Sequence, residues 1–383
     1  MKKITLLAML LLAIQFVYSQ EAIPVSGGDA IGLQGSGSYT VGQTFYTTNT
    51  AAAGSASQGV QQPFEFSGFI NNPNFTLASN DVTCLCENAA VGESGTLTIN
   101  GVDKTFTKRT EAELRALISA NESDPQIALT CTSGIIDMGS LFTGASAFNQ
   151  EIGSWDVSSV SNMNRMFKGA KAFNQNINSW DVSNVTDMRI MFSDATSFNQ
   201  NIGSWNVTNV TNMHSMFYNA NSFNQDIGSW DVRSVTNMEW MFGSASSFNK
   251  SINSWILSSL MNIQGMFYDA NTFNQDIGSW DVSKVTNMHA VLARATSFNH
   301  DISSWNVGNV ANMKKMFNRA SAFNQDIGSW DVGNITDMEY MFDNSGVSTS
   351  NYDAILTGWS QQTVQSNVAL GAAGLAYCSG EAA

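Results

Sequence analysis

Three histidines are the only side chains of this 383-residue chain that titrate near neutral pH as general bases: His214, His289 and His300. His214 and His289 share one position of a repeat but lie three repeats apart, roughly 14 Å at the usual strand spacing, too far to ligate one metal ion. His300 stands where six other repeats have Gln, so we interpret it as a surface variant. No Gly-x-Ser-x-Gly elbow or Walker-type phosphate loop is present. We therefore expect neither enzyme activity nor a cofactor.

Aspartates recur in register with the same repeat. One column places Asp276, Asp301 and Asp326 in successive repeats. Stacked carboxylates repel one another and can recruit a cation, which makes this column a candidate for weak calcium binding. Three carboxylates alone do not supply the six to eight oxygen ligands that calcium prefers. We therefore favour the interpretation that they are solvated turn residues bonded to nearby backbone amides.

The chain has four cysteines, Cys84, Cys86, Cys131 and Cys378. A single residue separates Cys84 from Cys86, a tighter spacing than ordinary structural zinc pairs use. We expect instead one disulfide joining Cys131 to Cys84 or Cys86, because export favours disulfides over free thiols. The sequence does not fix the connectivity.

The elements that position these residues belong to one repeat. Tryptophan recurs every 25 residues, and a Phe-Asn pair and a Met-Phe pair follow the same period. The Trp positions are 155, 180, 205, 230, 255, 280, 305 and 330. A period in the twenties sustained over about 210 residues indicates a solenoid, since one such unit cannot bury its own apolar face.

One unit illustrates the expected coil. Trp180 and Val182 alternate with polar residues, as in a short half-buried strand. Met188, Met191, Phe192 and Ala195 then follow at helical spacing, which predicts about two helical turns. The predicted fold class is an α/β solenoid, a leucine-rich-repeat-like stack of coils that each hold a short strand and a short helix. We interpret the repeated asparagines as a ladder that satisfies backbone groups at each corner, rather than as a binding row.

Two residues within each predicted helix vary between repeats. They lie between core positions, so we expect them to point outward and to form any ligand-binding face. The candidates on this face are Arg189, His214, Trp240, His289, Lys314 and Tyr340. An exposed Trp240 or Tyr340 is the kind of anchor that binding surfaces use. Unconstrained variation of solvent-facing residues is the alternative interpretation.

Flanking segments define the remaining organisation. We predict a signal peptide at 1–19, a β-type region rich in Gly, Ser and Thr at 20–80, and a small α+β capping unit at 81–134. The solenoid, with its Trp column buried, follows at 135–345, and a C-terminal cap that we interpret as truncated lies at 346–383.

Within these segments we expect a strand around Tyr39–Val41, a hairpin with Asn100-Gly101 as its turn, and a helix opened by a capping box of Thr110 and Glu113. We also expect a closing helix at 350–359, with Ser350 as its N-cap and Gly358 as its stop. No segment after residue 19 reaches 18 uninterrupted apolar residues, so we expect no transmembrane segment in the mature chain and a location outside the inner membrane. The net charge of −14 and the lack of a basic stripe argue against nucleic-acid binding.

The unit Phe-Asn-Gln-Asp-Ile-Gly-Ser-Trp-Asp-Val at 273–282, continuing to the Val-Leu variant at 291–292, resembles a known repeat. It is similar to the repeat of BspA-like leucine-rich-repeat surface proteins, which also occurs in mycoplasma surface lipoproteins, and the likeness covers residues 135–345. Residues 20–80 resemble N-terminal regions of exported proteins from gliding bacteria that have an outer membrane. The resemblance implies adhesion or recognition of a surface protein or glycan and supplies no catalytic residues. A structural exoprotein without a specific ligand, or a non-catalytic part of a larger surface protein, is the alternative.

Overall fold

The computed structural model describes residues 26–32, 35–41 and 72–378. The chain divides into two compact units, residues 1–68 and 69–383. In the first unit, β1 (Ser26–Gly32) pairs antiparallel with β2 (Gly35–Val41). The strand expected around Tyr39–Val41 is therefore confirmed. The predicted signal peptide at 1–19 lies outside the described residues.

The second unit begins with a small α+β cap. A short pair, β3 (Thr76–Leu77) and β4 (Cys84–Leu85), precedes a sheet of β5 (Ser94–Ile99), β6 (Val102–Lys108) and β7 (Thr130–Cys131) in the order β5-β6-β7. The hairpin predicted around Asn100-Gly101 is confirmed, because Ile99 pairs with Val102 and both turn residues have positive φ. This unit starts earlier than the predicted residue 81, since Phe75 is buried against Gly95 in its core.

Helix α2 (Glu111–Ala120) joins β6 to β7. Its predicted capping box is confirmed: the Thr110 side chain accepts from the Glu113 backbone N–H, and the Glu113 side chain accepts from the Thr110 backbone N–H. Leu114 and Ile118 on the buried face of α2 join the same apolar core as the repeats. The helix therefore closes the N-terminal end of that core.

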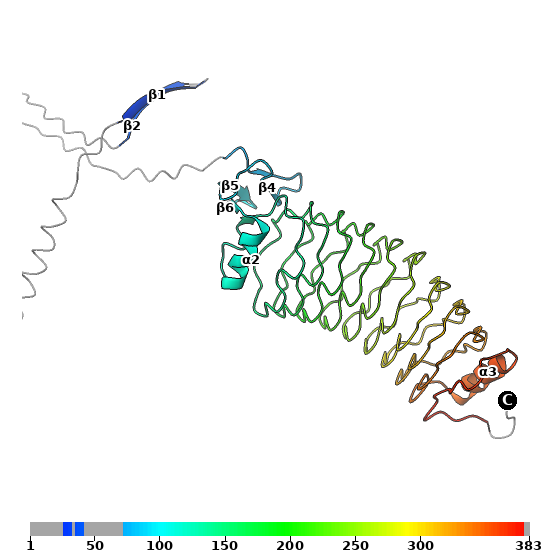
Figure 1. Ribbon diagram of the computed structural model, residues 1–383. Helices are drawn as coiled ribbons and strands as arrows, with labels where there is room; N and C mark the ends of the chain where they lie inside the picture. Colours follow the sequence, from blue (N-terminus) through cyan, green and yellow to red (C-terminus); the bar gives the residue numbers. More distant parts are fainter. Residues whose placement is uncertain (1–25, 33–34, 42–71, 379–383) are drawn as a thin grey trace, which may run out of the picture. The chain divides into compact units, whose positions relative to one another are not determined.

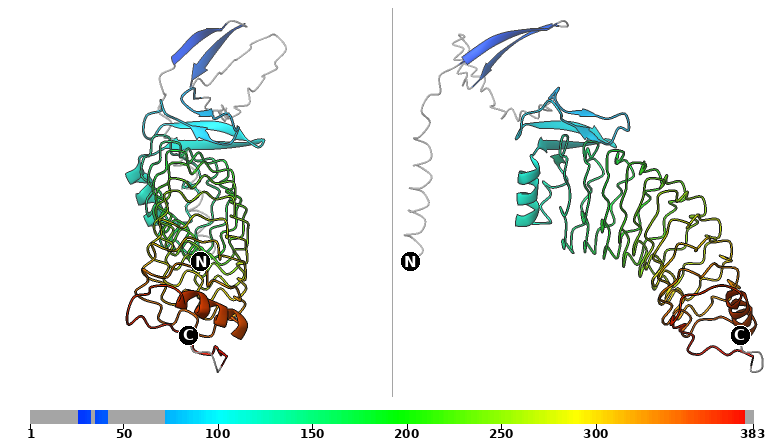
Figure 2. Two further views of the ribbon diagram at one scale, coloured as in Figure 1. Left: turned by 90° about the vertical axis from the view of Figure 1, so that its right-hand side faces the viewer. Right: turned by 45° about the vertical axis from the view of Figure 1, so that its right-hand side comes forward.

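The repeat forms a row of stacked 25-residue coils between α2 and α3 (Thr349–Ser360), as Figures 1 and 2 show. Parallel bridges join each coil to the next through one Asn or Asp per coil, from Asp137–Asn162 to Asn312–Asp337. The prediction that the Trp column is buried is confirmed, because all eight side chains are at most 4% exposed. Each indole Nε1 donates to a backbone carbonyl oxygen of the preceding coil or the cap, as Trp230 does to Ile202 at 3.0 Å.

The predicted short helix in each coil is wrong, and turns take its place. The backbone N–H groups of this segment alternate between two kinds of partner. Met191 N donates to Met188 O within the coil, whereas Phe192 N donates to Met216 O of the next coil at 2.8 Å. The residue at position 190 has a φ of 60°, which a right-handed helix does not tolerate. Met188, Met191, Phe192 and Ala195 are nevertheless all buried, as the pattern predicted.

The predicted strand at Trp180–Val182 is also absent. The Trp180 N–H donates to Ile177 O three residues earlier, which forms a turn. Both Trp180 and Val182 are buried. The alternation of apolar and polar residues therefore reflects burial of these side chains and does not indicate a strand. Inter-coil pairing occurs instead at the Asn and Asp positions that begin the Met-Phe segment.

The coils lie closer together on one side than on the other. Consecutive Phe rings of the Met-Phe column are 5.4–5.8 Å apart, whereas consecutive Trp rings are 6.3–6.5 Å apart. The coils therefore converge toward the Met-Phe segment, where most of the backbone bonds between coils are made.

Helix α3 closes the C-terminal end of the row. Its N-cap is Ser348 and not the predicted Ser350, and the helix continues to Ser360, past Gly358. Trp359 extends the Trp column by donating its Nε1–H to Ile327 O at 3.1 Å. The chain then adds one last rung, in which Phe342 N donates to Gly371 O and Met338 pairs with Leu370.

Candidate recognition surface

Two positions in every coil have left-handed backbone conformation, and both lie in the Met-Phe segment. We call them the first and second turn columns. The first column has φ between 52° and 60° and comprises Ser140, Arg165, Ile190, Ser215, Trp240, Gly265, Ala290, Lys315 and Tyr340. The second comprises Gly144, Gly169, Asp194, Asn219, Ser244, Asp269, Arg294, Arg319 and Asn344.

The two columns differ in the residues they use. Gly, Asn and Asp adopt positive φ most easily, and they hold six of the nine positions in the second column. The first column has only one such residue, Gly265, and includes Trp240, Tyr340 and the β-branched Ile190. Bulky residues in this conformation raise the energy of the folded backbone. Backbone preference therefore does not account for the composition of the first column.

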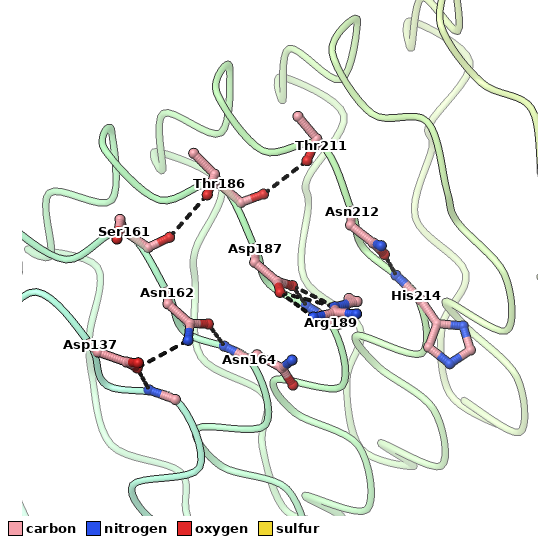
Figure 3. A network of polar contacts seen from close by, with 11 residues as sticks. Asp137, Ser161, Asn162, Asn164, Thr186, Asp187, Arg189, Thr211, Asn212 and His214 are labelled. Atoms are coloured by element: carbon pink, nitrogen blue, oxygen red, sulfur yellow. Dashed lines mark hydrogen bonds and ion pairs between the residues drawn. The ribbon is translucent and has the colours of Figure 1, made fainter.

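Some of the residues directly before the first column make contacts along the row. Lys314 Nζ contacts the carboxylate of Glu339 in the next coil, and His214 Nδ1 lies 3.5 Å from Glu239 Oε2. Arg189 pairs within its own turn, 2.7 Å from Asp187 Oδ2. Figure 3 shows the start of these turns in three coils, where Asn162, Asp187 and Asn212 each accept the backbone N–H two residues later.

The predicted ligand residues lie in the same segment of successive coils, but their side chains differ in how much they are exposed to solvent. Tyr340 is 48% exposed and lies beneath the ammonium groups of Lys314 and Lys315, 5.8 and 5.7 Å from its ring centroid. Trp240 is half-buried, because its ring rests on the Gly265 backbone. The expectation that both variable residues point outward fails for Ser215, Gly265 and Ala290, which are buried.

His289, the residue directly before Ala290 of the first turn column, is half-buried. Burial and the positive charges of Lys315 and Lys314 lower the pKa of its imidazole from 6.5, and Asp337 opposes this shift. Protonation is disfavoured because the imidazolium would lose water and face two ammonium groups. The imidazole is therefore held neutral, and is available as a donor and an acceptor, at lower pH than a free histidine.

Two aromatic residues of the surface were not predicted as ligand residues. Tyr218 and Tyr268 flank Trp240, with ring centroids 6.4 and 5.3 Å from its centroid. They occupy the column directly after the Met-Phe pair, which also varies between coils: Lys168, Ser193, Tyr218, Gly243, Tyr268, Ala293, Asn318 and Asp343. That variability is the signal in the sequence that could have identified them.

The acidic column does not form a common ligand set. The Oδ1 atoms of Asp276, Asp301 and Asp326 each accept the backbone N–H two residues later, at 2.8–2.9 Å. Backbone and Ser303 hydrogen bonds lower the pKa of Asp301. Within residues 72–378 and the first hairpin, no group of three His, Cys, Asp or Glu residues is arranged to hold a metal ion. These contacts favour the turn interpretation over the calcium interpretation.

The repeated asparagines form a ladder between coils. Asn199 Oδ1 accepts the backbone N–H of Asn224 at 2.9 Å and the side-chain amide of Gln225 at 2.9 Å in the next coil. His300 replaces this Gln, and its Nε2 lies 3.0 Å from Asn274 O. These side chains therefore serve the stack, as the ladder interpretation predicted.

Three of the cysteines lie in the N-terminal cap, and the fourth follows α3. Cys86 is bonded to Cys131, which selects between the two connectivities left open by the sequence. Cys84 is buried without a disulfide, and burial together with the charge of Asp156 raises the pKa of its thiol to about 12. Cys378 is exposed near the end of the chain, where its backbone N–H donates to Asp353 Oδ1.

A comparison with family models identifies the repeat. The family described as "Mycoplasma protein of unknown function, DUF285" matches three overlapping stretches, residues 113–220, 197–292 and 275–370, which together cover more than half of the chain. The chain belongs to this family. No curated protein and no solved structure matches the chain.

The DUF285 matches coincide with the stack and its closures. The first match begins within α2, and the last ends at Leu370, in the bridge that completes the final rung. Each match spans several coils, so the chain is a tandem array of DUF285 units. None of the described helices is long and apolar enough to cross a membrane.

Proposed function

We propose that this DUF285 protein is an exported surface protein that recognises a ligand through the first turn column and the residue before it. The finer assignments are part of the proposal: a BspA-like leucine-rich-repeat solenoid, located outside the inner membrane, without catalytic activity or cofactor. The repeat likeness of residues 135–345 and the signal-peptide pattern of residues 1–19 support these assignments.

One observation supports recognition more than any other. The first turn column holds Trp240, Tyr340 and Ile190 in a conformation that disfavours them, while the second column of the same turns uses Gly, Asn and Asp. A protein that needed these turns only for spacing would gain stability from small or Asn residues at both columns. Retention of large, chemically diverse side chains points to a role in contact with another molecule.

The arrangement of this column suits an extended ligand. Backbone bonds join consecutive coils through this segment, as from Ile190 N to His214 O at 2.8 Å. The variable side chains therefore stand at a regular spacing on a rigid support, on the side where the coils converge. Repeat proteins use such inner surfaces for binding.

A binding comparison on the full mature chain tests the proposal. The probes are a panel of purified surface proteins and glycans of neighbouring cells. The test variant carries Arg189→Ala, Trp240→Ala, Lys314→Ala and Tyr340→Ala. The control variant carries Asp276→Asn, Asp301→Asn and Asp326→Asn, which keep the oxygen acceptors of another exposed column.

We expect the test variant to lose binding by at least roughly tenfold and the control variant to keep it. Equal binding by both variants would exclude the first turn column as the recognition surface. Absence of any ligand in the panel would favour the alternative, a structural exoprotein without a specific ligand.

A further inference from the structure

Tyr218, Trp240 and Tyr268 form one aromatic cluster across three consecutive coils. The Trp240 ring meets Tyr218 at an interplanar angle of 81° and Tyr268 at 70°, so both contacts are edge-on. All three side chains are half-buried, which leaves part of each in contact with solvent. No other group of three aromatic residues is partly exposed on the described part of the Met-Phe segments.

Two glycines make room for the cluster. A Cβ atom on Gly265 would lie 2.4–2.5 Å from three atoms of the Trp240 ring. A Cβ atom on Gly243 would lie 2.9 Å from the Tyr218 ring and 3.3 Å from Trp240. Each ring therefore lies against the bare backbone of the following coil, and both glycines are buried beneath them. This support fixes the rings before any ligand arrives, which reduces the entropy lost on binding.

Polar residues neighbour Trp240, one before it in the chain and one in the next coil. The Trp240 backbone N–H donates to Gln264 O at 2.8 Å, which places Gln264 next to the cluster. Gln264 Oε1 accepts from Asn287 Nδ2 at 2.7 Å, and Glu239 Oε2 accepts from Asn262 Nδ2 at 3.2 Å. The oxygen atom of the Gln264 amide and one oxygen atom of the Glu239 carboxylate are thereby each held by a hydrogen bond, which orients both groups. The other ends, Gln264 Nε2 and Glu239 Oε1, have no hydrogen-bond partner among the described residues and can bind a ligand.

Aromatic rings with oriented amide and carboxylate groups on neighbouring residues match the chemistry of a sugar. The C–H groups on the face of a pyranose ring are weakly positive and pack against the negative face of an indole or phenol. Its neighbouring hydroxyl groups donate to a carboxylate and accept from an amide. A purely apolar protein anchor would leave the polar ends of Gln264 and Glu239 dehydrated without partners, which is unfavourable.

Charge selects the type of sugar. Glu239 is acidic, and its Oε2 lies 3.5 Å from His214 Nδ1. Arg294, a cation near Tyr268, is already paired with Asp269 at 2.9 Å. The chain as a whole carries a net charge of −14. Sugars with carboxylate or sulfate groups would be repelled. We propose that the Tyr218–Trp240–Tyr268 cluster binds a pyranose ring of a neutral glycan, an inference that rests on the proposed recognition function of this surface.

Direct binding of the full mature chain to defined oligosaccharides tests this site. The probes are hexasaccharides of glucose, mannose and galactose, compared with a hexasaccharide of uronic acids, by calorimetry. The key variant is Gly265→Ala. Ala290 occupies the same turn position with a φ of 55°, so alanine is compatible with the backbone, but the new Cβ would displace the Trp240 ring.

We expect at least one neutral hexasaccharide to bind and the uronic acid probe to bind at least roughly tenfold more weakly. Gly265→Ala and Trp240→Ala should each weaken neutral binding by at least roughly tenfold. Asp276→Asn, which changes an exposed turn outside the recognition surface and keeps the acceptor of the Gly278 N–H, should leave it unchanged. Melting temperatures of all variants identify any loss of folding.

Three results would overturn the glycan site: no binding of any neutral probe, preference for the acidic probe, or neutral binding that survives both Gly265→Ala and Trp240→Ala. A protein ligand that depends on Lys314 or Tyr340, found together with any of these results, would leave the proposed function intact and remove only this inference. Loss of both kinds of ligand would remove the proposed function as well.

Discussion

At the scale of single residues, each tryptophan of the repeat has two roles. The Trp230 ring fills the core, where 3% of the residue is exposed, and its Nε1–H satisfies Ile202 O in the preceding coil. One side chain therefore supplies apolar burial and a bond between coils. The regular spacing of tryptophan follows from this pair of roles, because each coil needs both.

Trp230→Ala should lower the free energy of unfolding by about 3–5 kcal/mol, the usual range for a large-to-small change in a packed core. Trp230→Phe is the matched control. It keeps most of the ring but removes the indole donor. Ile202 O still accepts the Trp205 backbone N–H at 3.1 Å, so the lost hydrogen bond should cost only about 0.5–1.5 kcal/mol. Chemical denaturation measures both. A loss smaller for Ala than for Phe would show that packing of this ring does not dominate.

The imidazole of His289 predicts a pH dependence. Its pKa is lowered in the fold by burial and by Lys315 and Lys314, so the unfolded chain binds the proton more readily below pH 6.5. Stability contributed by neutral His289 is fully present above pH 6.5 and is lost as the pH falls from 6.5 through the lower pKa of the folded chain. His289→Gln should therefore reduce the difference in melting temperature between pH 7.5 and pH 5.5. If the difference in melting temperature stays the same, other titrating groups cause the pH dependence.

At the scale of elements, the sequence predicts some features because their signals are local. The capping box of Thr110 and Glu113 and the Asn100-Gly101 turn depend on neighbouring residues only, and the structure has both. The turns of the coils depend on partners 24 or 25 residues away. The spacing of Met188, Met191, Phe192 and Ala195 fits a helix and a row of left-handed turns equally well, since both bury the same side chains.

The sequence predicted only the part of the candidate surface that can be recognised within one column of the repeat. Variation between coils identified Trp240 and Tyr340 as candidates. It could not show that Gly265 supports Trp240, or that Tyr218 and Tyr268 stand at its edges, because these contacts cross from coil to coil. Cys86 is distinguished from Cys84 only by the three-dimensional position of its side chain relative to Cys131.

The disulfide of the N-terminal cap gives a prediction at this scale. Cys86 and Cys131 are 45 residues apart, and closing a loop of that length stabilises a fold by about 4 kcal/mol in the chain-entropy model. The double variant Cys86→Ser and Cys131→Ser should lower the stability of the cap by up to this amount. Melting with and without reductant measures it. Cys84→Ser, which changes a buried thiol outside the disulfide, is the control and should keep its sensitivity to reductant.

At the scale of the second unit, each coil is stabilised by contacts with the coils directly before and after it. The apolar core runs without interruption from Leu114 of α2 to Trp359 of α3. The N-terminal cap meets the first coils through Cys84 N, which donates to Ser154 O, and through Thr132 Oγ1, which donates to Asp156 O. Both ends of the stack are thus bonded to segments that differ from the repeat, as stacked repeats require.

This architecture separates what the stack needs from what varies. The buried Trp, Phe and Met columns and the asparagine ladder hold the coils together, and they scarcely change from coil to coil. The first turn column changes at every coil and stands in a conformation that many of its residues disfavour. We therefore propose that these side chains serve recognition rather than stability.

The melting temperature of one variant tests this assignment most directly. Arg165, Lys315 and Tyr340 are the large exposed residues of the first turn column, whose fourth exposed member is Ser140. Asparagine adopts their backbone conformation more easily. The variant with Arg165→Asn, Lys315→Asn and Tyr340→Asn should gain about 1–3 kcal/mol in its free energy of unfolding. It should therefore melt at a higher temperature than the natural chain. A lower melting temperature would contradict the account, because it would mean that these side chains are retained to support the fold.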